Sequence, residues 1–299
     1  MFRAVIALPS GTSTQDHEPS GRKLAEMEQG PLASQPASQR EPAVGSGEFY
    51  DAYWHEDDEW NRVHPGNRHR ARLVITELAR ILGLGQDAGA GLSLLDVGCG
   101  NGLLLRRIAS RFPKLELYGE DVSPAAVELA SDVARETFVH DLGLSPLPTD
   151  RRFDLVVMTE VLEHVSDPAA FLRNLRRSLA PGASVVLTVP TGATTAFDRM
   201  IGHHRHYTLA ELDELCSDAD YRTVRAYRWG FPFFSLYRTI AWMLGDRARA
   251  ARPTDHGLLG RSATGLMYAS FFLCVKSQRI GRQVVAVIHP SSGEELPAK

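Results

Sequence analysis

Three histidines stand close together in the segment 201–208, which reads IGHHRHYT. They are His203, His204 and His206. An imidazole can take up or release a proton near neutral pH. The segment follows residues 183–189 (ASVVLTV), which predict a strand, and ligands of α/β sheets bind beyond the carboxyl ends of strands. We therefore predict a general base among these histidines and assign the role to His203 and His206; the alternative is a structural lead into a helix capped by Thr208.

A second group of side chains comprises Glu160, Glu163 and His164, at positions i, i+3 and i+4. On a helical turn this spacing places all three on one face. Two carboxylates and an imidazole together suit a divalent metal ion. The alternative is a segment without a metal, and we assign no metal ligand here.

A glycine-rich loop ends the stretch Leu92–Gly102, which reads LSLLDVGCGNG. The apolar run and the alternating glycines predict a buried strand that ends in a tight loop. A helical pattern begins at Leu103, so backbone N–H groups and a helix N-terminus would face a ligand. A dinucleotide-binding G-x-G-x-x-G loop would need glycine at position 103, and this sequence has leucine there.

The segment LDVGCGNG resembles the first motif of the class I S-adenosylmethionine (SAM) dependent methyltransferases. The segment GEDVSP around Asp121 resembles the G-x-D-x-S-P of that family. The block from DLVVMTEVLEHV through LAPGASVVLTVP resembles the members that include the ubiquinone-pathway O-methyltransferases, so the resemblance covers roughly residues 90–230. It implies SAM as cofactor and methyl transfer, an in-line displacement at a sulfonium carbon, as the activity.

The resemblance also implies contacts for the cofactor. Asp121 would accept hydrogen bonds from the ribose, although Glu120 competes for the role and Asp121 could instead be a plain helix cap. Asp141 and the backbone amide after it would meet the adenine edge, and Glu160 would lie near the methionine end. The predicted cofactor-binding residues are Asp96, Gly98, Gly100, Asn101, Asp121, Val122, Asp141, Leu142 and Glu160. Some relatives use an E-x-x-E-H segment for a metal, and others with EVLEHV use none.

Strand and helix patterns alternate from the glycine loop onward, which is typical of a parallel sheet covered by helices. We predict an α/β, Rossmann-like, doubly wound fold. Its sheet would have seven strands, mostly parallel, with helices on both faces. Residues 282–289 (RQVVAVIH) predict the last strand, antiparallel and at an edge of the sheet.

The predicted domain organisation combines composition with the resemblance to the methyltransferases. Residues 1–46 are rich in Ser, Gln, Glu, Pro and Gly and predict a disordered leader. We expect a methyltransferase domain over 47–290, with an N-terminal helical cap at 47–90 and a helical substrate or cap insertion at 230–281. A tail follows at 291–299.

Aromatic residues mark two segments of this domain. The first set comprises Phe49, Tyr50, Tyr53, Trp54 and Trp60. These rings either pack a helix onto the domain or form a flap near the sulfonium cation. The run 229–237 and the apolar segment 265–275 predict core packing by default; a pocket for an apolar acceptor, a dimer face or a peripheral membrane contact remain alternatives.

Composition excludes several classes of protein. The net charge of the 299 residues is −3, with no basic block suited to nucleic acid. The three cysteines form no C-x-x-C pair, which fits a reducing cytoplasm, and no uncharged run reaches transmembrane length. We expect a cytoplasmic protein, with a homodimer possible, that acts on a small molecule.

The expected acceptor is a hydroxyl oxygen in secondary-metabolite, quinone, lipid or saccharide biosynthesis. An N- or C-methyltransferase of the same fold and a non-catalytic SAM-binding partner protein are the alternatives. An NAD-dependent oxidoreductase is disfavoured by Leu103 and by the combined motifs.

Overall fold

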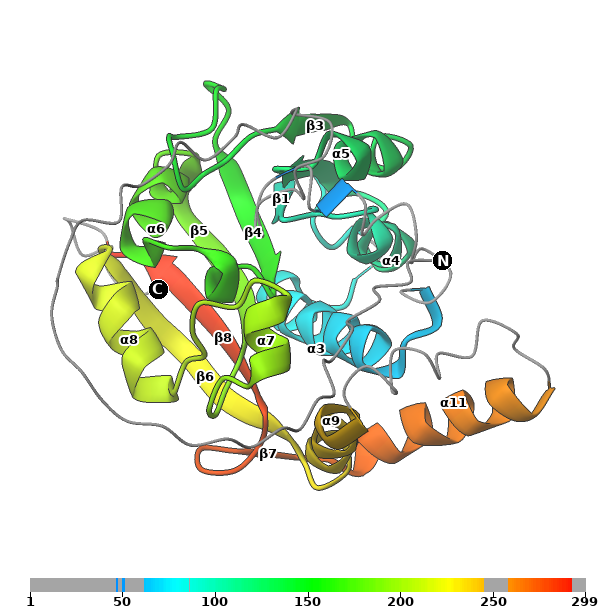
Figure 1. Cartoon of the computed structure of the whole chain (residues 1–299). Helices are drawn as coiled ribbons and strands as arrows, with labels where there is room; N and C mark the ends of the chain where they lie inside the picture. The colour runs from blue at the N-terminus through cyan, green and yellow to red at the C-terminus, as the bar shows by residue number, and fades with distance from the viewer. Residues whose placement is uncertain (1–46, 48–49, 52–61, 86, 245–257, 292–299) are drawn as a thin grey trace, which may run out of the picture. The chain divides into compact units, whose positions relative to one another are not determined.

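Strand β1 (Ser93–Val97) is buried along its whole length and lies inside the sheet. The structure, a computed structural model, describes residues 47, 50–51, 62–85, 87–244 and 258–291 (Figure 1). All of them belong to the unit Pro42–Lys299. The predicted leader 1–46 lies outside the described residues, as do Phe49, Tyr53, Trp54, Trp60, 245–257 and 292–299.

The first five strands are parallel, and their carboxyl ends therefore meet at one edge of the sheet. They are β1, β2 (Glu116–Asp121), β3 (Glu136–Val139), β4 (Phe153–Thr159) and β5 (Leu179–Pro190). In the register, Val97 pairs with Glu120 on one side and with Met158 on the other, and Thr159 pairs with Thr188. The residues that follow these strands can therefore form one site.

The remaining strands are β6 (Tyr221–Phe231), β7 (Val275–Ser277) and β8 (Gln283–Pro290). The sheet has eight strands in the order β3-β2-β1-β4-β5-β8-β6-β7. The predicted fold class is confirmed, with two differences in detail. The last strand, β8, lies inside the sheet, antiparallel to both β5 and β6, and the edge is formed by β7, a short strand that we did not predict.

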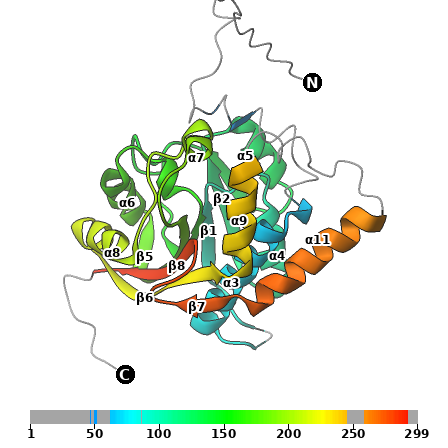
Figure 2. The same ribbon diagram turned by 60° about the horizontal axis from the view of Figure 1, so that its bottom comes forward.

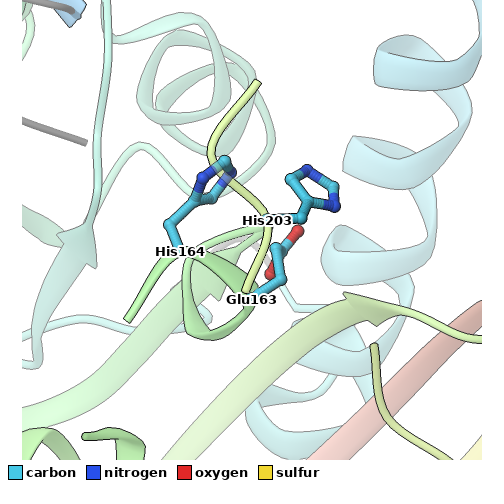
Figure 3. A group of neighbouring side chains, drawn as sticks. All are labelled: Glu163, His164 and His203. Carbon is cyan, nitrogen blue, oxygen red and sulfur yellow. The ribbon is translucent and has the colours of Figure 1, made fainter. Parts of the chain in front are cut away.

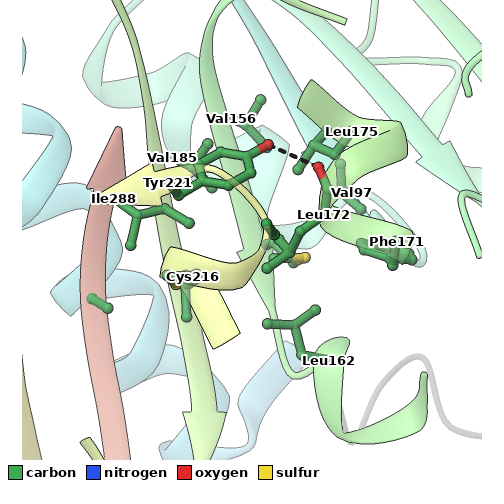
Figure 4. Close-up of a cluster of buried hydrophobic side chains, with 14 of the residues drawn as sticks. Val97, Val156, Leu162, Phe171, Leu172, Leu175, Val185, Cys216, Tyr221 and Ile288 are labelled. Atoms are coloured by element: carbon green, nitrogen blue, oxygen red, sulfur yellow. Dashed lines mark hydrogen bonds between the residues drawn. The ribbon is translucent and has the colours of Figure 1, made fainter. Parts of the chain in front are cut away.

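Helices cover both faces of the sheet (Figure 1). One face carries α3 (Pro65–Leu82), α4 (Leu103–Arg111) and α5 (Pro124–Ala130), and the other carries α6 (Pro168–Arg176) and α8 (Leu209–Asp218). Side chains alternate across the sheet, so Leu94 packs under the first group and Leu95 under the second. Figure 4 shows the hydrophobic core between the sheet and the helices α6 and α8. In this core the Tyr221 hydroxyl donates to the Leu172 carbonyl at 3.0 Å.

Two further helices, α9 (Phe233–Leu244) and α11 (Leu258–Ser270), lie beside β6 and α3 (Figure 2). The turn η3 (Phe271–Leu273) follows α11, so the apolar segment 265–275 contains the end of α11, this turn and the first residue of β7. Trp229, Phe234 and Phe271 form a third buried cluster here, which confirms core packing for part of the aromatic run. Among the described residues, no helix is long and apolar enough to cross a membrane.

Local signals set the ends of the helices. Ser123 and Asp167 cap α5 and α6 through their side chains, each with proline at the first helical position. Thr208 starts α8 with a capping box: its hydroxyl accepts from the Glu211 amide at 3.2 Å, and the Glu211 carboxylate accepts from the Thr208 amide at 2.7 Å. This cap ends the histidine segment 201–208.

Thr208→Ala removes the hydroxyl from the capping box. We expect the free energy of unfolding to fall by about 0.5–2 kcal/mol, because an amide of the first turn loses its acceptor. Denaturant unfolding measures the change, and Thr208→Ser is the matched control because it keeps the hydroxyl. Equal stability of the alanine and serine variants would show that the cap contributes nothing here.

Candidate active site

The glycine loop between β1 and α4 has the backbone that the sequence predicts. Gly98, Gly100 and Gly102 have φ values of 69°, 51° and 74°, in the left-handed region that favours glycine. A Cβ at Gly98 would lie 2.6 Å from Cγ2 of Val161, which follows β4. A side chain at this position would therefore push the loop away from the segment that carries the candidate catalytic residues.

The acidic residues that end β2 hold this loop. The Asp121 carboxylate accepts from the Gly100 amide at 2.9 Å and from the Ser123 amide at 3.0 Å. The Glu120 carboxylate is 3.4 Å from the Gly98 amide, and its carbonyl accepts from the Cys99 amide at 2.9 Å. Both acids therefore position the loop, and Asp121 is more than a helix cap, because its carboxylate joins the ends of β1 and β2.

Asp96, at the base of the loop, is buried, and neither carboxylate oxygen has a hydrogen-bond partner among the described residues. Burial, and then the charge of Asp121, raises the pKa of Asp96 well above its ordinary range. Asn101 is also buried, and its side-chain oxygen is 3.4 Å from the Leu103 amide at the start of α4. A buried carboxylate without a partner suits a cationic ligand, and SAM carries a sulfonium and an ammonium group.

The other predicted cofactor residues at the sheet edge differ in exposure. Val122 is half-buried between Asp121 and Ser123, and Asp141 is exposed after β3. The Asp141 carboxylate accepts from the Gly143 amide at 2.7 Å and so shapes its own turn. The Leu142 side chain lies in the core, which leaves only its backbone for a ligand.

Glu160 follows β4 with a positive φ of 57° and is bound on several sides. Its carboxylate pairs with Arg70 at 3.1 Å, accepts from the Thr188 hydroxyl at 3.1 Å and contacts the Gln283 amide. Burial alone would raise the pKa of Glu160, but the charges of Arg70 and Arg238 hold it below its ordinary value. Glu160 is therefore an ionised group that already has partners.

Glu163, in the turn η2 (Leu162–His164), has the opposite environment. It is fully buried, and neither carboxylate oxygen has a partner among the described residues. Burial, and then the charge of Glu160, raises the pKa of Glu163 well above its ordinary range. The ligand atoms of Glu163, His164 and His203 lie within 4.8 Å of one another (Figure 3). The sequence spacing grouped Glu163 and His164 with Glu160, whereas the fold places His203 beside them instead of Glu160.

The histidine segment lies directly against this turn. The His204 amide donates to the Glu163 carbonyl at 2.7 Å, whereas the His204 side chain is exposed. His203 is buried, and burial followed by the charge of His164 lowers its pKa to about 3. Its Nδ1 lies 3.0 Å from Nε2 of His206. The structure thus brings His203 and His206 together and leaves the His204 side chain outside the cluster.

Tyr50 and Asp51 contact the site at two places, at His164 and at the start of α5. The Tyr50 hydroxyl is 3.0 Å from Nδ1 of His164. The Asp51 carboxylate contacts the Ser123 hydroxyl and accepts from the Ala125 amide at 3.2 Å. Both alternatives for this segment, a helix packed on the domain and a flap over the cofactor, place residues 50–51 against the domain, so both stay predictions. Nothing in their spacing predicted Asp51 as a partner of α5, because the contact joins residues more than seventy positions apart.

Comparisons with known proteins find methyltransferases that are similar to part of this chain. The mitochondrial ubiquinone biosynthesis O-methyltransferase of Arabidopsis thaliana is 28% identical over 152 residues, which are 48% of this chain and 44% of the relative. The ubiquinone biosynthesis O-methyltransferase of Methylobacterium sp. (strain 4-46) is 33% identical over 141 residues, 44% of this chain and 55% of the relative. The chain therefore spans about half the length of the curated relatives that it matches.

A solved structure supports the fold. Phosphoethanolamine N-methyltransferase 2 of Haemonchus contortus, in complex with phosphomonomethylethanolamine and S-adenosylhomocysteine, matches with a TM-score of 0.53 and 18% identity, over 82% of this chain and 58% of that one. The family described as methyltransferase domain matches residues 67–226, which run from α3 into β6 and include the whole glycine loop, Glu160, Glu163 and the histidines. The chain therefore belongs to the class I SAM-dependent methyltransferase family.

Proposed function

We propose that this protein methylates a hydroxyl oxygen of a small molecule, in secondary-metabolite, quinone, lipid or saccharide biosynthesis. The observation that carries the proposal is the group Glu163, His164 and His203 beside the glycine loop, in which Glu163 and His203 are buried and His164 is half-buried. A hydroxyl must lose its proton to become a good nucleophile, and this group could hold that proton or a metal ion. A neutral amine would need neither, so the cluster favours oxygen over nitrogen. The two curated O-methyltransferases are consistent with it.

The chain would hold the cofactor through its glycine loop. SAM, when bound, supplies a methyl group on a sulfonium centre. Asp121 already fixes the Gly100 amide with one oxygen and the Ser123 amide with the other, and a carboxylate has further lone pairs for ribose hydroxyls. Asp96 is placed under the loop with an unpartnered carboxylate that suits a positive group. Glu160, ionised and fixed by Arg70, would place a carboxylate near the methionine end.

In the first mechanism, His203 takes the proton from the acceptor hydroxyl. Burial keeps its ring neutral at pH 7, so one ring nitrogen has a lone pair. Holding the acceptor in line with the methyl group would then supply most of the acceleration. A pKa of about 3 makes a lone imidazole a weak base, which favours help from another group.

In the second mechanism, a divalent metal ion binds at Glu163, His164 and His203. Two observations favour it: the Glu163 carboxylate lacks a partner among the described residues, and both rings are neutral at pH 7 because burial lowers their pKa values. Neutral imidazole and carboxylate are suitable ligands for such an ion. A bound ion would lower the pKa of the acceptor hydroxyl. Glu160 is not part of this site, because Arg70, Thr188 and Gln283 occupy its carboxylate.

Asp121→Ala should weaken SAM binding by about 1.5–3 kcal/mol, roughly 10- to 150-fold, because a charged acceptor and the anchor of the Gly100 amide are lost together. Titration calorimetry measures the dissociation constant, and thermal unfolding checks that the variant is folded. Glu120→Gln is the control and should stay within a few-fold of the native value. If the glutamine variant carries the loss and the alanine variant does not, the ribose contact belongs to Glu120.

Glu163→Gln and His203→Ala together separate the two mechanisms. If a metal acts, chelator should abolish turnover of labelled SAM on a panel of hydroxylated acceptors, Mg²⁺ should restore it, and Glu163→Gln should be as damaging as His203→Ala. If His203 acts alone, turnover should survive chelator, Glu163→Gln should have a small effect, and His203→Ala should lower kcat about 10²–10⁴-fold with SAM affinity unchanged.

His204→Ala is the matched control, because this neighbouring histidine has an exposed side chain. Full turnover by His203→Ala in chelator would overturn both mechanisms and point to an acceptor that arrives already nucleophilic. SAM binding with no turnover on any acceptor, in the presence of Mg²⁺, would instead favour a non-catalytic SAM-binding protein.

A further inference from the structure

His206 forms a hydrogen bond whose direction is fixed by its partner. Its Nδ1 lies 3.2 Å from the carbonyl oxygen of Gly192, which follows β5. A carbonyl oxygen can only accept, so the hydrogen must be on Nδ1 of His206. A neutral imidazole has one donor and one acceptor nitrogen. Nε2 of a neutral His206 is therefore the acceptor.

The same reasoning extends to His203. Its Nδ1 lies 3.0 Å from Nε2 of His206. Since that nitrogen of His206 accepts, Nδ1 of His203 must carry the hydrogen and donate. A neutral His203 then has its lone pair on Nε2. If the tautomers of both rings were reversed, Nδ1 of His206 would be unprotonated. It would then face the Gly192 carbonyl oxygen, and two acceptors would be in contact.

The surroundings of His206 favour its neutral form. The nearest acid is Asp198, whose Oδ2 lies 3.8 Å from Nε2 of His206, beyond hydrogen-bond distance. The charge of Asp198 already has partners: Arg238 at 3.1 Å, and the amide and hydroxyl of Thr195, each at 2.8 Å. The His206 side chain is also only 3% exposed, and a charge on an enclosed ring would lose its solvation.

We propose that His206 is a positioning residue: through a hydrogen-bond chain that starts at the Gly192 carbonyl, it holds His203 in the tautomer whose Nε2 is unprotonated. The working nitrogen of His203 is thus Nε2, whether it takes the proton of the acceptor or binds a metal ion. The inference rests on the proposed role of His203 in acceptor activation, but the tautomer itself does not depend on that role.

Nitrogen-15 NMR of the histidine rings tests the chain in the full-length protein at neutral pH, with chelator and without ligand. Long-range proton–nitrogen spectra distinguish a protonated from an unprotonated ring nitrogen, and loss of one signal set in His203→Gln assigns His203. We expect His203 protonated at Nδ1 and unprotonated at Nε2. Spectra of the native protein alone can overturn the proposal. They would do so if His203 is protonated at Nε2, or if His206 is protonated at both ring nitrogens.

Variants of His206 then test its positioning role. His206→Phe removes the acceptor, so His203 should populate both tautomers, and kcat should fall about tenfold or more while KM changes little. His206→Gln keeps a side-chain oxygen that can accept from His203 and should restore the tautomer and much of kcat. His204→Gln is the control and should change neither. Unchanged His203 spectra in a folded His206→Phe variant overturn the role of His206.

The two proposals fail in different ways. If His203→Ala keeps full turnover while the native spectra show the expected tautomer, the proposed use of His203 is wrong and the hydrogen-bond chain is right. If His203→Ala loses turnover while the native spectra show Nε2 protonated, acceptor activation at His203 stands and the positioning role of His206 is wrong.

Discussion

Buried carboxylates at the carboxyl edge of the sheet are the constraint on which the rest of the site depends. Asp96, Glu120, Asp121 and Glu163 are buried, and Glu160 is half-buried, where β1, β2 and β4 end. Burying an ionised carboxylate is costly unless it is paired or hydrogen-bonded. Backbone amides contact Glu120 and Asp121, and Arg70 compensates Glu160. Asp96 and Glu163 have no such partner among the described residues and would need a positive ligand to be ionised.

The two acids without described partners lie in different parts of the site. Asp96 is under the glycine loop, and Glu163 is beside His164 and His203. Burial raises the pKa of each, so each favours its neutral form until a positive partner arrives. This division agrees with a cofactor pocket on one side and an acceptor-activating centre on the other, with Val161 against Gly98 as the point where they meet.

The antiparallel half of the sheet also serves the site. Because β8 lies between β5 and β6, Gln283 at its start reaches Glu160. Helix α9, which packs beside β6, supplies Arg238 to Asp198, and that pairing allows the nearby His206 to stay neutral. The aromatic run 229–237 extends into α9. Besides packing the core, it therefore helps to place the Arg238 guanidinium beside Asp198, the acid nearest to His206.

The sequence by itself determined what depends on neighbouring residues. Alternating glycines fixed the loop, Thr208 with Glu211 fixed the start of α8, and the apolar periodicity established the α/β class. Short-range steric and hydrogen-bonding rules act within a few residues, so they can be read from spacing. Only the tertiary structure decided that Arg70 neutralises Glu160, that His203 joins Glu163, and that β8 lies inside the sheet. These contacts join distant residues, and their partners are chosen by packing and by the need to compensate buried charge, neither of which leaves a local pattern.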